Sequence, residues 1–185
     1  MAMKTTLLAA LLFASPAFGS IYWNNGNPDL QGDLLNGIGL LGGSGNSLVY
    51  DDFVVGAGGA TVTGVFSNDA LGSVMNLAEI GTAFWEIRSG VSDGNGGTLV
   101  ASGTGAANVG SSGVSILGNP IYQIGVNGLN VSLTPGTYWL AVAPDVTTSG
   151  ISTFIATTAG AGGVGTPQAQ NGNSFINSDL LGLVF

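Results

Sequence analysis

The chain has neither cysteine nor histidine among its 185 residues. Without cysteine no disulfide can form, so packing must stabilise the fold. The two absences also remove the commonest ligands of zinc, copper and haem, and the histidine that activates serine and cysteine nucleophiles. Few routes to catalysis remain, and we expect a protein that is not an enzyme and has no cofactor, with calcium as the one metal left to consider.

The first 19 residues have the pattern of a secretory signal peptide, with Lys4 ahead of an apolar run at residues 7–14. The run is too short to span a bilayer. Small residues at Ala17 and Gly19 predict cleavage after Gly19; Ser15 and Ala17 leave a cut after Ala17 as the alternative. We expect residues 20–185 to form a single secreted domain.

Basic residues are nearly absent from the rest of the chain. Once Lys4 leaves with the signal peptide, Arg88 is the one basic residue against ten acidic ones, a net charge of −9. This balance argues against nucleic acid as a partner, and the loss of the lysine excludes a serine–lysine dyad.

Glycine is abundant where charge is scarce. The 33 glycines, with 45% hydrophobic and 6% charged residues, favour short strands joined by tight turns over helices. Alternating or apolar segments predict strands at residues 47–55, 60–66, 82–89, 98–102, 121–126, 152–157 and 179–185. Residues 24–45 are expected as turn-rich loop. The pattern predicts an all-β fold, a two-sheet antiparallel β-sandwich of jelly-roll type with about nine or ten strands.

The clearest β pattern lies at residues 129–143, where two alternating arms flank the turn residues Thr134, Pro135 and Gly136. Turn residues between alternating arms predict a β-hairpin. The second arm is apolar on both faces, so we expect it to be covered on each side.

Strand alternation predicts the faces on which two aspartates lie and the pairing of two charged residues. Asp51 and Asp52 point to opposite faces of one strand, so one of them is expected inside, where it needs a partner such as Arg88 or backbone donors. Glu86 and Arg88 lie two residues apart on one face of the strand at 82–89, which predicts a structural ion pair. Glu86 has no second acid two or four residues away, which argues against a carboxylate-pair glycoside hydrolase.

Ligand candidates lie at the start of the mature chain. Tyr22 and Trp23 adjoin a polar loop and are candidates for flat platforms that stack against polysaccharide, with Asp29 and Asp33 beside them. Trp85 and Trp139 sit among apolar neighbours and are expected in the core.

The loop at residues 90–97 offers Asp93 and Asn95 as oxygen ligands for calcium, but it lacks the downstream acid that completes an EF-hand. Asn-Gly between strands is also a turn signal, and the turn is the favoured interpretation.

Five short segments carry a resemblance to a known group: YWNNG at 22–26, VYDDFVV at 49–55, VTGVFSN at 62–68, LTPGTYWLAV at 133–142 and LLGLVF at 180–185. Together they resemble the β-sandwich ectodomain of exported bacterial proteins that carry a PEP-CTERM sorting tail. The resemblance implies a cell-surface or matrix-associated protein of a Gram-negative bacterium and no particular activity. No sorting tail follows residue 185 in this sequence; truncation and release stay open as explanations.

These observations predict a secreted, non-enzymatic protein with a structural or adhesive role and polysaccharide or matrix components as partners. Self-assembly into a surface layer or fibre is the chief alternative.

Overall fold

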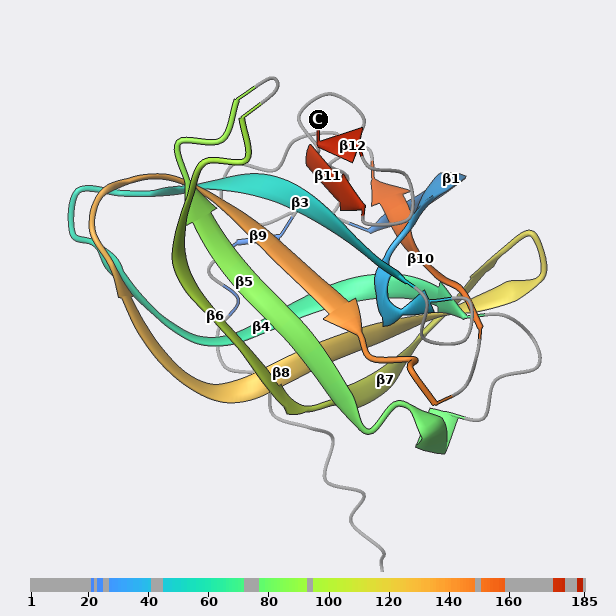
Figure 1. The fold of residues 1–185 in the computed structure, drawn as a ribbon. Coiled ribbons are helices and arrows are strands. Elements are labelled where there is room, and N and C mark those ends of the chain that lie inside the picture. The colour runs from blue at the N-terminus through green and yellow to red at the C-terminus, as the bar shows by residue number, and fades with distance from the viewer. Residues whose placement is uncertain are drawn as a thin grey trace, which may run out of the picture.

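Twelve β-strands and one short 3-10 helix make up the part of the chain described by the computed structural model, which covers residues 21, 23–24, 27–40, 45–71, 77–92, 95–148, 151–158, 175–178 and 183–184 (Figure 1). The strands are β1 (Pro28–Leu35), β2 (Gly37–Gly39), β3 (Gly45–Val55), β4 (Ala60–Leu71), β5 (Thr82–Ser89), β6 (Thr98–Ala106), β7 (Asn108–Ile116), β8 (Asn119–Leu133), β9 (Gly136–Pro144), β10 (Thr153–Thr158), β11 (Phe175–Ser178) and β12 (Leu183–Val184), and the helix is η1 (Leu77–Glu79). The signal-peptide prediction falls on residues outside this part.

The strands form two antiparallel sheets packed face to face. One has the order β1-β10-β4-β8-β7, and the other has the order β12-β11-β3-β9-β5-β6 with β2 attached to β3. Eight of these strands have the arrangement of a jelly roll, in which β1-β10-β4-β8 faces β3-β9-β5-β6. The predicted sandwich is confirmed. There are more strands than the nine or ten expected because β1 and β2 lie within the predicted loop at residues 24–45, and β7 lies between the predicted strands at 98–102 and 121–126.

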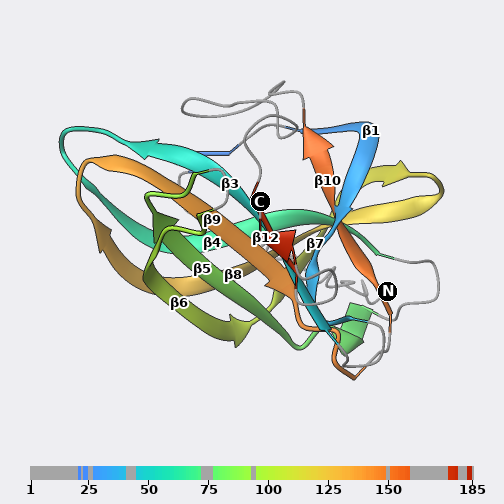
Figure 2. The same ribbon diagram turned by 45° about the horizontal axis from the view of Figure 1, so that its top comes forward.

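The predicted hairpin at residues 129–143 is wrong. Its two arms are strands β8 and β9, but they belong to different sheets, so the turn carries the chain across the sandwich. The turn between β3 and β4 does the same, and both lie at the end of the molecule away from β1 and β10 (Figures 1 and 2). Tyr138 fixes the β8–β9 crossing, because its hydroxyl donates to Thr134 O at 3.0 Å.

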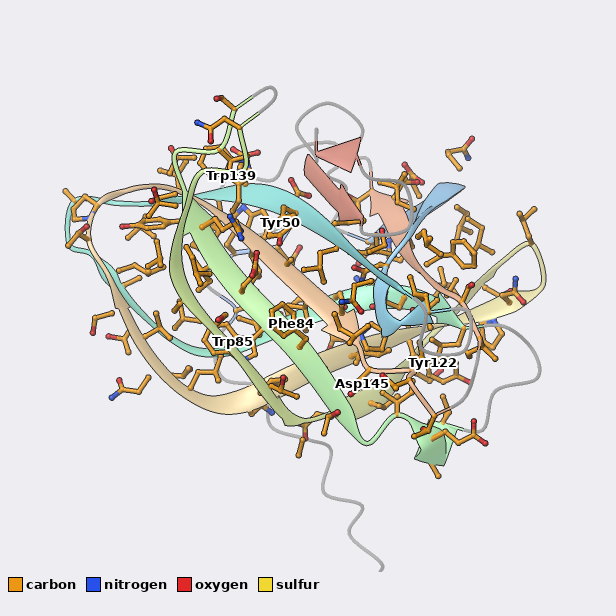
Figure 3. The ribbon with its side chains drawn as sticks, in the orientation of Figure 1. Tyr50, Phe84, Trp85, Tyr122, Trp139 and Asp145 are labelled. Atoms are coloured by element: carbon orange, nitrogen blue, oxygen red, sulfur yellow. The ribbon has the colours of Figure 1, made fainter. Side chains whose placement is uncertain are left out.

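The main core fills the space between the sheets, and its largest members include Trp85, which is 6% exposed, Phe53 and Tyr138. A second cluster covers the outer face of the β3–β9–β5 layer, with Tyr50 at its centre and Trp139 and Phe84 packed against it (Figure 3). This outer cluster explains why the 138–143 segment is apolar on both faces, as predicted. Trp85 lies in the core as expected, whereas Trp139 is half-buried on the outer face.

A polar clamp centred on Asn36 links the two sheets. Asn36 is fully buried, and its Nδ2 donates to Asp69 Oδ1 in β4 at 2.8 Å and to Val142 O in β9 at 2.9 Å. Ser67 donates to the other oxygen of Asp69. Burial nonetheless raises the pKa of Asp69 to about 7, against these two hydrogen bonds, which favour the charged form.

Within the described residues, no helix has the length and apolar character that crossing a membrane requires.

Candidate functional site

Glu86, Arg88 and Tyr50 form a hydrogen-bonded group on the outer face of the β3–β9–β5 layer. Arg88 Nε lies 2.5 Å from Glu86 Oε1, and Arg88 Nη1 donates to Gly96 O at 2.9 Å. The Tyr50 hydroxyl donates to the same Glu86 oxygen, and the guanidinium carbon lies 5.9 Å from the centroid of the Tyr50 ring. Burial, the hydrogen bond to Glu86 and the charge of Glu86 raise the pKa of Tyr50 above its ordinary value. The contact between Glu86 and Arg88 is the structural ion pair that the two-residue spacing predicts. The bond from Arg88 to Gly96 O also links the sheet to the loop after β5.

Asn95 is a turn residue within the loop at residues 90–97. Ser92 and Asn95 exchange two backbone hydrogen bonds of 3.0 and 2.8 Å, and Asn95 Oδ1 accepts from the Gly97 N–H at 3.0 Å. Asp93, the other calcium candidate, lies outside the described residues. Across the described ranges, no group of three or more His, Cys, Asp or Glu side chains is placed to hold a metal ion. The amide oxygen of Asn95 therefore has a structural role in the turn.

The four ligand candidates at the start of the mature chain are not brought together by the described geometry. Tyr22 and the side chain of Asp33 lie outside the described parts of the chain. Asp29 Oδ1 accepts from the Gln31 N–H at 2.9 Å and from the Thr157 hydroxyl at 2.7 Å, so it pins β1 to β10. Trp23 is the remaining candidate with a described environment.

Trp23 is half-buried against the core rather than displayed as an open platform. Its ring centroid lies 5.5 Å from that of Phe53, with an interplanar angle of 39°, and Phe53 in turn lies 5.9 Å from Tyr138. A row of three aromatic rings therefore runs from the N-terminal segment into the sandwich. Trp23 and Phe53 of this row also border a cleft.

The cleft lies between the two sheets and has a volume of about 930 Å³. Trp23 and Phe53 supply aromatic surface, and the polar side chains in its wall are those of Thr61, Thr63 and Asn127. The lining contains no charged residue. Its size lies within the range of pockets that hold small molecules, and its mixture of aromatic surface with a few neutral hydrogen-bonding groups suits a neutral polar ligand.

An irregularity in β8 shapes one wall of the cleft. Val62 pairs with Val131 and Gly64 pairs with Asn127, so three residues of β8 stand opposite Thr63 of β4. Gly128, within this bulge, has a φ of +77°, a left-handed conformation that glycine adopts without strain. The bulge bends β8 beside the cleft, which is a common position for such features.

Asp51 is the inward-facing member of the aspartate pair, since its row across the sheet continues through Leu140 and Ile87, both of which line the cleft. Its Oδ1 accepts from the Asp52 N–H at 3.0 Å, so a backbone donor and not Arg88 is its partner. Burial raises the pKa of Asp51 to about 7; the backbone bond opposes this shift, and the charge of Asp52 adds to it.

Comparison of the chain with protein-family models, with curated proteins and with solved structures finds no match. The site therefore has to be interpreted from its own geometry.

Proposed function

We propose that this protein is a secreted, non-enzymatic binding protein of the cell surface or extracellular matrix, and that the cleft between its sheets binds neutral polysaccharide. The observation that carries the proposal is the cleft of about 930 Å³ with Trp23 and Phe53 on its wall. Aromatic rings pack against the C–H faces of sugar rings, while hydroxyl and amide groups satisfy sugar hydroxyls.

The charge of the protein favours neutral polysaccharides over acidic ones. The cleft wall is uncharged, and the mature chain carries a net charge of −9. Acidic polymers such as alginate are repelled by this field, particularly at low ionic strength. Neutral glucans, mannans and xylans are the expected partners.

The extracellular setting rests on the sequence. The first 19 residues have the signal-peptide pattern, and the resemblance to PEP-CTERM ectodomains implies the surface of a Gram-negative bacterium. An adhesive or matrix role follows from export together with polysaccharide binding.

Affinity gel electrophoresis tests the proposal directly. The mature protein is run through native gels that contain soluble neutral or acidic polysaccharides, and retardation is measured against polymer-free gels. We expect at least one neutral polymer to retard the protein. Trp23→Ala should weaken the affinity for that polymer, measured from the retardation, tenfold or more. Trp139→Ala is the matched control, because Trp139 lies on the outer face of the sheet, and it should be retarded like the parent. No retardation by any polymer would overturn the proposal.

A second candidate function, self-assembly, is favoured by the edges of the sheets. The edge strands β6 and β7 contain no charged residue and no proline, and Leu99 and Val100 in β6 are 49% and 41% exposed. Charges and proline are the usual protection of an edge against strand pairing. Light scattering across a concentration series tests this alternative: growth that Leu99→Lys abolishes would support it, and a constant mass would exclude it.

A further inference from the structure

A small chamber of about 110 Å³ adjoins the cleft, and the two share Trp23, Gly64, Val65, Phe66 and Leu140 as lining residues. One water needs about 10–15 Å³ of such space, so the chamber has room for several waters or for the hydroxyl-bearing edge of a sugar ring. Its wall combines the N-terminal segment with strands of both sheets. A ligand seated in the cleft can therefore extend into the chamber.

Three side chains that line this chamber have a buried polar atom without a hydrogen-bond partner in the described part of the chain. They are Trp23 through Nε1, Asp51 through Oδ2 and Thr158 through Oγ1. Asp51 and Thr158 are only 7% and 4% exposed. Buried polar groups are nearly always satisfied in folded proteins, and an unsatisfied one lowers stability. Three of them around one cavity indicate that the cavity is built for a polar occupant.

The three atoms restrict the chemistry of that occupant. The indole N–H of Trp23 only donates, the ionised carboxylate of Asp51 only accepts, and the hydroxyl of Thr158 does both. A cation would leave the indole N–H unsatisfied, and an anion would be repelled by the carboxylate. A hydroxyl group satisfies all three, because it accepts from the indole and donates to the carboxylate.

We infer that the chamber is the specificity pocket of the cleft, where Trp23, Asp51 and Thr158 bind the hydroxyl-bearing edge of one neutral sugar residue. This inference rests on the proposed function and names the part of the polysaccharide that is recognised. The C–H surface of the sugar packs on Trp23 and Phe53 in the cleft, while its hydroxyls enter the chamber. Because burial raises the pKa of Asp51 to about 7, both protonation states are populated near neutral pH, and a hydroxyl partner suits both, since it donates to the carboxylate and accepts from the protonated acid.

Trp23 provides a direct spectroscopic probe, since the chain has three tryptophans and each contributes one indole N–H signal in a two-dimensional ¹H–¹⁵N spectrum. Trp23→Phe assigns the Trp23 signal by its disappearance. The mature protein is then titrated with glucose, mannose, galactose and xylose, the last of which lacks a hydroxymethyl group. We expect the Trp23 signal to move saturably with at least one sugar, while the signals of Trp85 and Trp139 stay in place and report an intact fold.

Two substitutions test the other members of the chamber. Asp51→Asn and Thr158→Val should each weaken sugar affinity tenfold or more. Asp52→Asn is the matched control on the opposite face of the same strand, and it should bind like the parent. If no sugar moves the Trp23 signal, as expected for a chamber filled by water alone, the inference is wrong. It is also wrong if both chamber variants bind sugar with unchanged affinity.

The two proposals fail in different ways. If polysaccharide gels retard the protein but no sugar moves the Trp23 indole signal, polysaccharide binding is supported and the specificity pocket is contradicted. If free sugars move the Trp23 signal but no polymer retards the protein, the specificity pocket is supported and polysaccharide binding is contradicted.

Discussion

Asp51→Asn should change the pH dependence of stability in a direction unusual for an acidic group. The ordinary pKa of an aspartate is 3.8, and burial raises that of Asp51 to about 7. Between these values the folded protein holds a proton that the unfolded chain has released. The contribution of Asp51 to the free energy of unfolding should therefore be greatest below about pH 4, fall as pH rises toward 7, and level off above it.

The size of the effect follows from the same shift. Because one pKa unit corresponds to about 1.4 kcal/mol, the rise of the pKa from 3.8 to about 7 lowers the free energy of unfolding by about 4 kcal/mol above pH 7. Domains are stable by about 5–15 kcal/mol, so the loss is large enough to measure. Asp69, whose pKa is also raised to about 7, adds a loss of the same sign.

Urea unfolding followed by circular dichroism at pH 4.5, 6 and 8 is the assay. Asn keeps the Oδ1 that accepts from the Asp52 N–H but carries no charge. We expect Asp51→Asn to match the parent at pH 4.5 and to be more stable by a few kcal/mol at pH 8. Asp145→Asn is the control of opposite sign, because hydrogen bonds from Thr147, the hydroxyl first, lower the pKa of Asp145, and its contribution is lost as pH falls. A lower stability of Asp51→Asn at pH 8 would refute the reasoning, since the ionised carboxylate would then be stabilising.

Three further substitutions test the framework, each by urea unfolding. Asn36→Ala should cost about 3 kcal/mol or more, because the clamp between the sheets is lost and its buried partners stay unsatisfied; a cost below about 1 kcal/mol would contradict the clamp. Arg88→Met should lower the free energy of unfolding by about 2–3 kcal/mol, which is less than for a fully buried pair because the Arg88 side chain is 22% exposed. Adding Glu86→Met to this variant should restore at least half of the lost stability. An unchanged unfolding midpoint in Arg88→Met would show that the ion pair does not stabilise the fold. Gly97→Ala should cost more than about 2 kcal/mol, since φ is +67° and a Cβ would lie 2.3 Å from Ser89 O, and a neutral result would rule out that strain.

Sequence pattern was sufficient for the faces of individual strands. Alternation put Glu86 and Arg88 together on one face of the strand at 82–89, and Trp85 was expected in the core; the structure has both. The reason is physical: successive side chains of a strand point to opposite faces, so orientation depends on a few neighbouring residues.

Pairing between distant segments was not predictable in the same way. Thr134, Pro135 and Gly136 have the chemistry of a turn, and a turn is present, but turn residues do not determine which sheet the next strand joins. β9 pairs with β3 and β5, and the paired residues lie 49 or more positions earlier in the chain. The second arm, apolar on both faces, was the signal that its layer is covered on both sides, by the main core and by the outer cluster around Tyr50.

The candidate site shows the same division. Trp23 was identified as a ligand candidate from its polar neighbourhood, and alternation predicted that one aspartate of the 51–52 pair lies inside. Thr158 and Asn36 carry no pattern that separates them from other polar residues of a glycine-rich chain. Thr158 reaches the chamber through β10, which is distant from Asp51 in sequence, so only the tertiary fold could reveal the group.

We propose that the space between the two sheets holds a neutral sugar. A high-resolution crystal structure of the mature protein soaked with the sugar that moves the Trp23 signal tests it most directly. We expect a sugar ring in the cleft against Trp23 and Phe53, with hydroxyls within hydrogen-bond distance of Asp51 Oδ2 and Thr158 Oγ1. A cleft and chamber that hold only ordered water, or a sugar bound on the outer face near Trp139, would contradict it.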